Sequence, residues 1–431
     1  MRLAVRRSEP LRGEVRPPSD KSLTHRAYML ASIADDESVV RSPLRGEDCE
    51  ATLRCLASMG LEYQAEGDSE IRLKPARDWR VPPGELDCGN SGTTMRLLAG
   101  LIASRPIQAT LAGDESLSRR PMARIAEPLR RMGAQVEGDM PPLRIGGSPS
   151  LRGIEHCSSV ASAQVKSCVL LAGLRAQGET WVLEPAQSRD HTERMLRSLG
   201  VPVLARPLKP TAHVEAVGVL GGSRIPGFDF EVPGDISSAA FWMVAAAIVS
   251  GSQVTLKQVG VNPTRTGILD VFGQAGIVLK AWTGRNELGE PVADLSVGAS
   301  VGGRAFLIEG PLVPRLVDEI PVLAVLATQL PGVSRIRDAS ELRVKESDRI
   351  AKVADGLRAM GARVETVEDG MDVEGPAALR GAVIDCDKDH RIAMAFAIAG
   401  LVAEGETVIG GAEAIATSYP SFEDDLQRLQ A

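Results

Sequence analysis

The amino-acid sequence predicts an α/β protein in which one structural unit occurs six times, three times in each of two domains. Three observations carry this prediction. Similar segments recur at nearly even spacing, each begins with a polar cluster that can start a helix, and each contains two helices separated by a short β-branched strand. Repeats of this length indicate units that must stack to bury their apolar faces. The copies begin near Pro18, Cys88, Val160, Pro233, Val317 and Asp387, at spacings of 70, 72, 73, 84 and 70 residues.

The first copy shows how its elements are recognised. Either Ser19 or Asp20 can cap an apolar helix that ends at Asp35. A strand begins at Ser38, and a second helix follows it. That helix stops at Gly60, because glycine readily adopts the left-handed conformation with which many helices end.

The five later copies repeat the same order of elements. Their first helices are almost wholly apolar, which places them inside the domains with sheets around them. The strands after these helices are QATL, TWVLE, QVTLK, VSRIR and ETVIG. The similar segments PPSDKS and EVPGDISS mark two points where the chain passes between domains. We therefore expect residues 18–232 to form the first domain, and residues 1–17 with 233–431 to form the second, which includes the N-terminal strand.

The composition excludes several classes of protein. Of the 431 residues 44% are hydrophobic and 24% are charged, which is typical of a soluble globular protein. The net charge of -7 argues against a nucleic-acid partner bound through bulk charge. Six scattered cysteines and five histidines form neither a C-x-x-C nor an H-E-x-x-H pattern, so we expect reduced thiols and no metal site. The N-terminus lacks a signal peptide and Ala239–Val249 is too short to span a bilayer, which favours a cytoplasmic protein with no membrane partner.

Basic and small polar residues gather where the helices begin. Lys21 and His25 share one helix face, and Ser22 and Arg26 share another. Small residues in Gly89–Thr94 allow backbone N–H groups to approach a phosphate or carboxylate closely. Each cluster alone is compatible with a solvated helix face or an ordinary N-cap, but their repetition indicates a site for anionic ligands. Further members are Ser162, Gln164, Lys166, Asp389, His390 and Arg391, with Arg120, Arg189, Arg265 and Arg349 near the starts of second helices.

Carboxylates occur among these cations. Asp318 in VDEIPVL is compatible with either a catalytic base or a helix N-cap, and Glu346 lies beside Lys345 and Arg349 in LRVKESDRI. The sequence contains no Walker A motif, no strand-linked G-x-G-x-x-G and no G-x-S-x-G. Neither a nucleotide cofactor nor a serine-hydrolase mechanism is therefore supported.

Taken in order, these clusters resemble the family of 5-enolpyruvylshikimate-3-phosphate (EPSP) synthases. The resemblance covers nearly the whole chain and is carried by PSDKSLTHRA, CGNSGTTMRLLAG, RRPM, ASAQVKSCVLLAGL, VDEIPVLA, LRVKESDRI and DKDHRIAMAFA. The segments SAQVK, RDHTE and NPTR are similar to the class II branch of that family. The resemblance implies two inside-out α/β barrels with βαβαββ-type repeats, whose helix N-termini face a cleft between the domains.

The resemblance also implies a transferase of the shikimate pathway to chorismate and aromatic amino acids. The enolpyruvyl group of phosphoenolpyruvate would pass to the 5-hydroxyl of shikimate 3-phosphate, and phosphate would leave. No metal or organic cofactor would take part. We further expect a monomer that glyphosate inhibits.

Two sets of substrate residues follow from the resemblance, position by position. The shikimate 3-phosphate set is Lys21, Ser22, Arg26, Ser162, Ala163, Gln164, Asp318 and Lys345, with Ser188 or Arg189 at the phosphate. The phosphoenolpyruvate set is Lys21, Asn90, Gly92, Arg120, Gln164, Arg349 and Arg391. Asp318 would take the proton of the 5-hydroxyl, and Glu346 would deliver a proton to the methylene carbon, with Lys21 and His390 nearby.

Three positions depart from the pattern of the family. Ala416–Pro420 lacks the lysine that many relatives carry there, which puts one phosphate contact in doubt. Gly113–Glu115 reads G-D-E where the class II branch usually reads G-D-K. Gly92 lacks the methyl group of the alanine found in glyphosate-tolerant members, so we expect a glyphosate-sensitive enzyme.

Two other functions are compatible with six such repeats. One is the related enzyme that transfers enolpyruvyl to UDP-N-acetylglucosamine, but its reactive cysteine is missing from Gly113–Arg120. The other is a repeat scaffold or an RNA-end-processing protein. The negative net charge and the completeness of six copies disfavour this second alternative.

Overall fold

The computed structural model describes residues 1–207, 215–299 and 302–431, and the chain divides into two compact units. Unit 1 consists of Met1–Pro18, Pro233–Arg285 and Pro291–Ala431, and unit 2 of Ser19–Val232 and Asn286–Glu290. This division differs from the predicted boundaries at Pro18 and at Asn286–Glu290. The second difference has a physical reason, because Leu288 packs against the core of unit 2 and Glu290 contacts His191.

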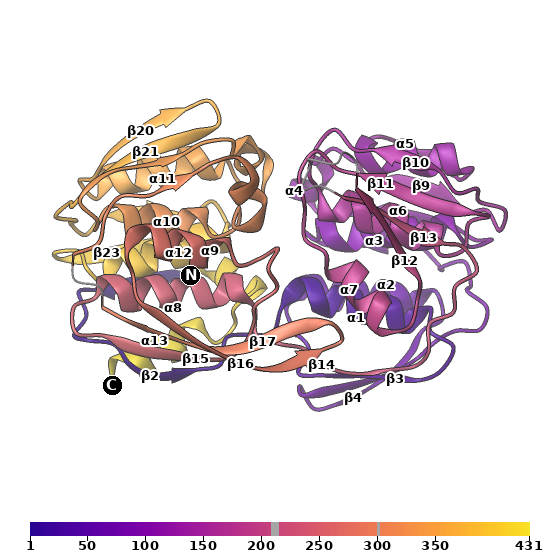
Figure 1. Ribbon diagram of the computed structural model, residues 1–431, viewed down its shortest axis with the longest axis horizontal. Coiled ribbons are helices and arrows are strands. Elements are labelled where there is room, and N and C mark those ends of the chain that lie inside the picture. The colour runs from indigo at the N-terminus through magenta and orange to yellow at the C-terminus, as the bar shows by residue number, and fades with distance from the viewer. Residues whose placement is uncertain (208–214, 300–301) are drawn as a thin grey trace. The chain divides into compact units, whose positions relative to one another are not determined.

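Unit 2 contains three four-stranded sheets and three inner helices, α1 (Lys21–Ser32), α3 (Gly92–Ala103) and α6 (Ala163–Gly173) (Figure 1). Its other helices are α2 (Glu47–Ser58), α4 (Glu115–Ser118), α5 (Ala123–Met132) and α7 (His191–Ser198). The first sheet has the order β14 (Asp229–Glu231), β3 (Ser38–Arg41), β5 (Glu70–Lys74) and β4 (Glu62–Glu66). The second has the order β6 (Leu86–Asp87), β7 (Gln108–Ala112), β9 (Leu143–Gly146) and β8 (Gln135–Glu137). The third has the order β10 (Glu155–Cys157), β11 (Glu179–Leu183), β13 (Glu215–Leu220) and β12 (Val203–Pro207).

Unit 1 repeats this plan with the inner helices α8 (Ile236–Ile248), α10 (Ile320–Ala327) and α12 (His390–Gly400). Its other helices are α9 (Gly267–Ala275), α11 (Arg349–Ala359) and α13 (Phe422–Gln430), with short 3₁₀ helices η1 (Gly310–Arg315), η2 (Ser340–Val344) and η3 (Ala412–Thr417). One sheet has the order β16 (Leu279–Glu287), β17 (Glu290–Gly298), β15 (Gln253–Gly260) and β2 (Arg12–Val15). A second has the order β18 (Leu307–Ile308), β19 (Gly332–Ile336), β21 (Gly370–Gly375) and β20 (Arg363–Val367). The third has the order β1 (Arg2–Arg6), β23 (Glu406–Gly410) and β22 (Val383–Asp385).

The repeat is visible in the strand pairing. In four sheets the strand before an inner helix pairs in parallel with the strand after it, as β6 does with β7 and β18 with β19. At the two chain crossings these first strands are exchanged, because β14 pairs with β3 and β2 pairs with β15. β1 pairs antiparallel with β23, so the prediction that the N-terminal strand joins the C-terminal half is confirmed.

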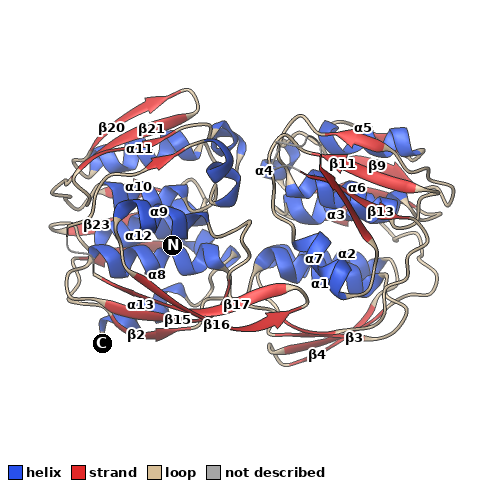
Figure 2. Cartoon of the chain, in the orientation of Figure 1, coloured by secondary structure: helices blue, strands red, loops and turns tan. Residues whose placement is uncertain are grey.

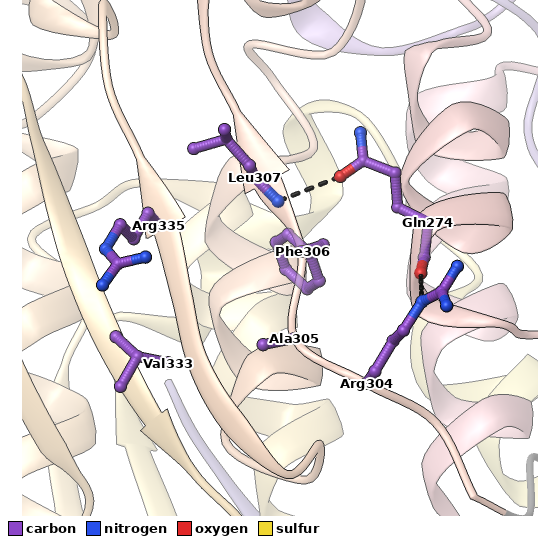
Figure 3. Close-up of a pocket in the computed structure, with 7 residues that line it drawn as sticks. All are labelled: Gln274, Arg304, Ala305, Phe306, Leu307, Val333 and Arg335. Atoms are coloured by element: carbon purple, nitrogen blue, oxygen red, sulfur yellow. Dashed lines mark hydrogen bonds between the residues drawn. The ribbon is translucent and has the colours of Figure 1, made fainter.

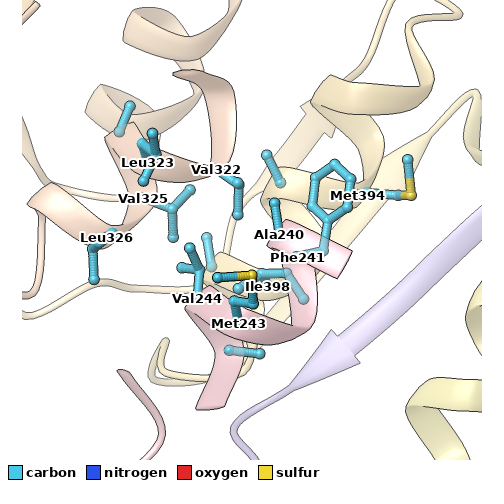
Figure 4. Close-up of a cluster of buried hydrophobic side chains, with 14 of the residues drawn as sticks. Ala240, Phe241, Met243, Val244, Val322, Leu323, Val325, Leu326, Met394 and Ile398 are labelled. Carbon is cyan, nitrogen blue, oxygen red and sulfur yellow. The ribbon is translucent and has the colours of Figure 1, made fainter. Parts of the chain in front are cut away.

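The inner helices are buried on nearly all sides, as their continuous apolar sequences predict. In α8 every residue from Ile236 to Ala247 is buried. Figure 4 shows side chains of α8, α10 and α12 packed together, among them Val244, Leu323 and Ile398. Sheets and outer helices surround them in each unit (Figure 2). No helix in the described part of the chain is long and apolar enough to cross a membrane.

Side-chain caps fix where five of the six inner helices begin. Asp20, Ser91, Ser162, Asp235 and Asp389 each accept a hydrogen bond from a backbone N–H of the first turn. The open choice between Ser19 and Asp20 is thereby settled in favour of Asp20. Because the first turn of each inner helix is anchored in this way, the residues that follow the caps have defined positions.

Candidate functional site

The first turn of α1 presents Lys21 beside a carboxylate. Lys21 Nζ lies 3.0 Å from Asp48 Oδ2, and both side chains are largely buried. Ser22 lies one residue further along the helix, and its carbonyl accepts a hydrogen bond of 3.0 Å from Arg26 Nη1. A paired lysine so close to a helix N-terminus can exchange its carboxylate partner for an anionic ligand.

Arg26 is buried and is held by two hydroxyl groups. Its Nε donates to Thr192 Oγ1 at 2.8 Å, and its Nη2 donates to Ser167 Oγ at 2.9 Å. Burial lowers the pKa of Arg26 to about 10, although the nearby carboxylates of Glu193 and Asp20 oppose that effect. The arginine therefore remains a cation at neutral pH, and α7 and α6 fix its direction.

The loop before α3 holds Asn90 and Arg120 together. Arg120 Nη2 donates to Asn90 Oδ1 at 2.5 Å, and Asn90 Nδ2 donates to Asp114 Oδ2 at 2.7 Å. Gly92 begins α3, and a Cβ atom added there would lie 2.9 Å from Arg96 Nη1 and 3.5 Å from Arg120 Nη1. Gly92 thus leaves space directly beside two guanidinium groups.

Gln164 connects the start of α6 to the start of α3. Its Nε2 donates to Thr93 Oγ1 at 2.9 Å, and its Oε1 accepts from Arg96 Nη1 at 2.5 Å. Sequence reasoning missed Arg96, although a lone arginine within the apolar segment TTMRLLAG was a usable signal. A buried or half-buried cation in an apolar helix requires an anionic or polar partner.

Ser162, Ala163 and Ser188 lie around a second missed residue, Glu184. Ser162 caps α6 and Ala163 is the first residue of that helix. The backbone N–H of Ser162 donates to Glu184 Oε1 at 2.8 Å, and Ser188 Oγ donates to Glu184 Oε2 at 2.8 Å. Arg189 follows Ser188 and is half-buried.

A chain of buried polar side chains links α1 and α2 to the start of α3. His25 Nδ1 lies 2.7 Å from Thr52 Oγ1, which lies 2.6 Å from Thr94 Oγ1. Thr94 Oγ1 in turn lies 2.8 Å from Ser91 Oγ, the cap of α3. Burial lowers the pKa of His25 to about 3, since Asp48 opposes the effect only in part and Lys21 adds to it. His25 is therefore neutral at physiological pH.

In unit 1 the central cation is Arg349, which is 1% exposed and surrounded by carboxylates. Its Nε lies 2.8 Å from Asp389 Oδ2, its Nη1 3.2 Å from Asp318 Oδ1, and its Nη2 2.5 Å from Glu346 Oε2. Burial disfavours the charged guanidinium, but these three carboxylates together raise the pKa of Arg349. Burial alone would raise the pKa of Asp389, but the Arg349 guanidinium outweighs burial and keeps that pKa below its ordinary value.

The remaining predicted residues of unit 1 lie around this centre. Arg391 Nε is 3.8 Å from Asp318 Oδ1, and Arg391 Nη1 is 3.5 Å from the Asp318 carbonyl. His390 is buried at the first position of α12. Lys345 is more exposed and pairs with Glu341 at 2.8 Å. Asp318 is not a helix cap, because α10 begins at Ile320 with Glu319 at the N-cap position.

In the fourth copy the polar and charged side chains at the helix start contact one another. Arg265 Nη2 lies 3.1 Å from Asp235 Oδ1 and 2.6 Å from Ser237 Oγ, and Ser237 Oγ also donates to Glu319. All of these groups are buried. Asp235, Ser237 and Glu319 thus hold the Arg265 cation inside unit 1.

A shallow surface pocket in unit 1 lies apart from the predicted residues (Figure 3). Gln274 closes one side of it, since its carbonyl accepts from Arg304 Nε at 2.6 Å and its Oε1 accepts from the Leu307 N–H at 2.9 Å. Among the described residues, no group of three or more His, Cys, Asp or Glu side chains is arranged to hold a metal ion.

The structure therefore brings the predicted residues together in two groups, one at the helix starts of each unit. The group in unit 2 contains Lys21, Ser22, Arg26, Asn90, Gly92, Arg120, Ser162, Ala163, Gln164, Ser188 and Arg189. The group in unit 1 contains Asp318, Lys345, Glu346, Arg349, His390 and Arg391. Each group combines cations, backbone N–H groups and carboxylates, as binding and protonating small anions requires.

The family model and the relatives found by sequence carry the name of one activity. A family model described as "EPSP synthase (3-phosphoshikimate 1-carboxyvinyltransferase)" matches residues 5–426. A 3-phosphoshikimate 1-carboxyvinyltransferase from Anaeromyxobacter sp. (strain Fw109-5) is 49% identical over 426 residues, which cover 97% of this chain and 96% of the relative. One from Brevibacillus brevis is 47% identical over 432 residues and covers 99% of both chains.

Solved structures give the same result. The EPSP synthase from Acinetobacter baumannii aligns with a TM-score of 0.88 and 41% identity, over 99% of this chain and 98% of that one. The enolpyruvyl transferase NikO from Streptomyces tendae aligns with a TM-score of 0.78 over 99% of this chain and 97% of that one, and at 18% identity it shows the fold alone.

These similarities define the class of the protein, an α/β transferase with the fold of EPSP synthases, and confirm the predicted fold class. The chain belongs to the EPSP synthase family.

Proposed function

We propose that this protein transfers the enolpyruvyl group of phosphoenolpyruvate to the 5-hydroxyl of shikimate 3-phosphate and releases phosphate. The observation that carries the proposal is that cations, carboxylates and helix N-termini gather in each unit of a chain that belongs to the EPSP synthase family. Each substrate has one carboxylate and one phosphate, so together they require about as many cations as the two groups provide.

We assign shikimate 3-phosphate to residues that offer hydroxyl, amide and cationic donors. In unit 2 Arg26 is charged and held in place, and Ser162 presents the N-terminus of α6. Ser188 already donates its only hydroxyl proton to Glu184, which favours the guanidinium of Arg189 as the phosphate ligand. The full proposed set is Lys21, Ser22, Arg26, Ser162, Ala163, Gln164, Ser188, Arg189, Asp318 and Lys345.

We assign phosphoenolpyruvate to the arginine-rich positions. Guanidinium groups bind carboxylate and phosphate in a bidentate manner, so Arg349 and Arg391 suit the carboxylate and Arg120 suits the phosphate. The space beside Gly92 allows the phosphate to approach the start of α3. The full proposed set is Lys21, Asn90, Gly92, Arg120, Gln164, Arg349 and Arg391.

The proposed chemistry needs two proton transfers. As the 5-hydroxyl oxygen bonds to the central carbon of phosphoenolpyruvate, its proton must leave and the methylene carbon must gain one. We propose Asp318 as the base and Glu346 as the acid, with Lys21 and His390 nearby. Arg349 contacts both carboxylates, which keeps them in one place. In the elimination that follows, the new methyl group gives one proton back to the Glu346 carboxylate, the C–O bond to phosphate breaks, phosphate leaves and the carbon–carbon double bond is restored.

The test is phosphate release from the two substrates by wild type and by Asp318→Asn. Proton transfer by a positioned group contributes about 10²–10⁴-fold, so we expect kcat to fall by that factor. The KM for phosphoenolpyruvate should not rise, because Arg349 and Arg391 lose a competing carboxylate.

The matched control is Asp294→Asn in the same unit. Asp294 also pairs with a cation, Lys257, but lies outside both proposed sets. Its substitution should leave kcat within about twofold. Unchanged turnover in Asp318→Asn would remove that residue from its role. Wild type that releases phosphate with UDP-N-acetylglucosamine but not with shikimate 3-phosphate would overturn the proposed function.

A further inference from the structure

Unit 2 contains a buried cluster of charges that the proposed chemistry does not use. Lys166 Nζ lies 3.0 Å from Glu184 Oε2 and 2.8 Å from Glu193 Oε1. The three side chains are only 3%, 6% and 2% exposed. Lys166 comes from α6, Glu184 directly follows β11, and Glu193 lies in the first turn of α7. The cluster therefore connects three consecutive elements of the third repeat.

Such a cluster is costly to build. Each buried charge loses several kcal/mol of hydration, which the pairing recovers only with good geometry and further hydrogen bonds. Burial works against the charged lysine, but the carboxylates of Glu193 and Glu184 outweigh it and raise the pKa of Lys166. The lysine is thus a permanent cation. If the cluster served stability alone, well-packed apolar residues in place of the three charged ones would stabilise the unit equally well.

Unlike Glu193, Glu184 also accepts hydrogen bonds from two serines. Its Oε1 accepts from the backbone N–H of Ser162, the cap of α6, and its Oε2 accepts from Ser188 Oγ. Lys166 Nζ also donates to the Ser188 carbonyl at 3.4 Å. Ser188 is therefore fixed at its side chain and at its backbone, which limits the positions open to Arg189.

We infer that Glu184 is a positioning residue for shikimate 3-phosphate, which sets the start of α6 and the Ser188–Arg189 segment so that both meet the phosphate of that substrate. The inference rests on the proposed function. One carboxylate fixes two segments of the same proposed binding set, and Lys166 holds that carboxylate in turn. Glu184 does not touch the reacting atoms in this account, so it acts on affinity and leaves the chemical step alone.

The experiment compares Glu184→Gln with Glu193→Gln in the full-length enzyme. Both substitutions neutralise a buried carboxylate on the same lysine, but only Glu184 contacts the two serines. Loss of a hydrogen bond to a charged group costs about tenfold or more in binding. In Glu184→Gln we expect that increase in the KM for shikimate 3-phosphate and in its Kd measured by calorimetry. The KM for phosphoenolpyruvate and kcat should change less than about threefold.

Glu193→Gln should keep the KM for shikimate 3-phosphate within about threefold, and thermal unfolding of both variants reports their stability. Equal increases in that KM in the two variants, or an unchanged KM in Glu184→Gln, would overturn the inference. An equal loss for both substrates in proportion to lost stability would show a purely structural role. Wild type without turnover would instead contradict the proposed function itself, so the two failures are distinguishable.

Discussion

At the scale of single residues, cations and carboxylates are closely balanced around Arg349. Arg349 and Arg391 face Asp318, Glu346 and Asp389 within 4 Å. Asp389 is also bonded to Ser347 and to the backbone of Arg391, so it is fixed as part of the helix cap. In the function that we propose, a substrate carboxylate would compete with Asp318 and Glu346 for the two arginines. Both acids would then lie beside the substrate, where the proposed proton transfers require them.

Substitution of Gly92 by alanine adds one methyl group to the proposed phosphoenolpyruvate site and so tests it. In Gly92→Ala the new Cβ would lie 2.9 Å from Arg96 Nη1, so that guanidinium group must shift, and 3.5 Å from Arg120 Nη1, which is van der Waals contact. Overpacking of this kind costs about 1–3 kcal/mol, and we expect the inhibition constant of glyphosate to rise at least ~10-fold. The measurement is inhibition by glyphosate against varied phosphoenolpyruvate, with a smaller rise expected in the KM.

Gly273→Ala is the matched control, since this helical glycine in α9 has nothing within 4 Å of an added Cβ. Both constants should stay unchanged in that variant. Wild type should itself be inhibited by glyphosate in competition with phosphoenolpyruvate. Tight binding of phosphoenolpyruvate together with resistance to millimolar glyphosate would contradict this expectation.

Sequence reasoning located the charged residues at helix starts better than the residues that hold them in place. Lys21, Arg349 and Arg391 stand at helix starts, and such positions can be read from caps and apolar patterns. Glu184, Arg96 and Asp48 were missed because their roles depend on partners brought from distant segments. Ser188 is only four residues from Glu184, but nothing in the sequence indicates that the same carboxylate will also accept a hydrogen bond from the start of α6 at Ser162.

At the scale of elements, three helices of unit 2 are joined by a hydrogen-bond chain that begins at the neutral imidazole of His25. The hydroxyl chain from His25 through Thr52 and Thr94 to Ser91 joins α1, α2 and α3. Each of these side chains is at most 1% exposed. A proton on His25 would place an isolated charge inside this packing, which is why the pKa lies so low.

This burial predicts a dependence of stability on pH. Between pH 6.5 and about 3 the unfolded chain carries a proton on His25 and the folded unit does not. Stability should therefore decline as the pH falls through this range, by up to ~1.4 kcal/mol per pH unit. His25→Gln cannot titrate, so its free energy of unfolding should fall less between pH 7 and pH 4.5 than that of wild type, by about 2 kcal/mol.

Urea unfolding of the two proteins at both pH values provides the measurement. The glutamine can keep a hydrogen bond to Thr52, so any constant loss of stability in the variant does not affect the comparison. Parallel pH profiles would show that His25 does not carry the effect.

The elements themselves were largely predictable, and their exceptions have local causes. Apolar runs and caps predicted the inner helices, and β-branched segments predicted the strands that follow them. A proline precedes three of the second helices, at positions 121, 263 and 420, but α5, α9 and α13 begin two to four residues after it. Proline is accepted equally well in the turn before a helix, so its presence does not fix the first residue.

At the scale of the whole molecule, the exchanged strands make the two units unequal. Unit 2 obtains all the strands of its three sheets from within Ser19–Val232. Unit 1 needs β1 and β2 from the beginning of the chain as well as residues after Pro233. The turn Asn286–Glu290 was not predictable as part of unit 2, because a hairpin turn carries no sequence signal for the surface on which it packs.

We expect the fragment Ser19–Val232 to fold alone, with cooperative urea unfolding and a stability of about 5 kcal/mol or more. It lacks only Asn286–Glu290, including Glu290 as the partner of His191. The fragment from Pro233 to Ala431 should fail to unfold cooperatively, because β15 and β23 lose their pairing strands and the core loses Leu11 and Val15. Cooperative unfolding of the second fragment alone would contradict this reading of the strand exchange.

The strand exchange also sets an order of events during protein synthesis. The N-terminal strands leave the ribosome first, but β2 pairs with residues about 240 positions later and β1 with residues 400 positions later. At about 5–20 residues per second, β1 waits ~20–80 s for its partner. During that interval unit 2 can complete itself, while an apolar segment that includes Leu3, Val5 and Leu11 remains unpaired. Production of this protein thus depends on protecting its first fifteen residues until its last sheet is made.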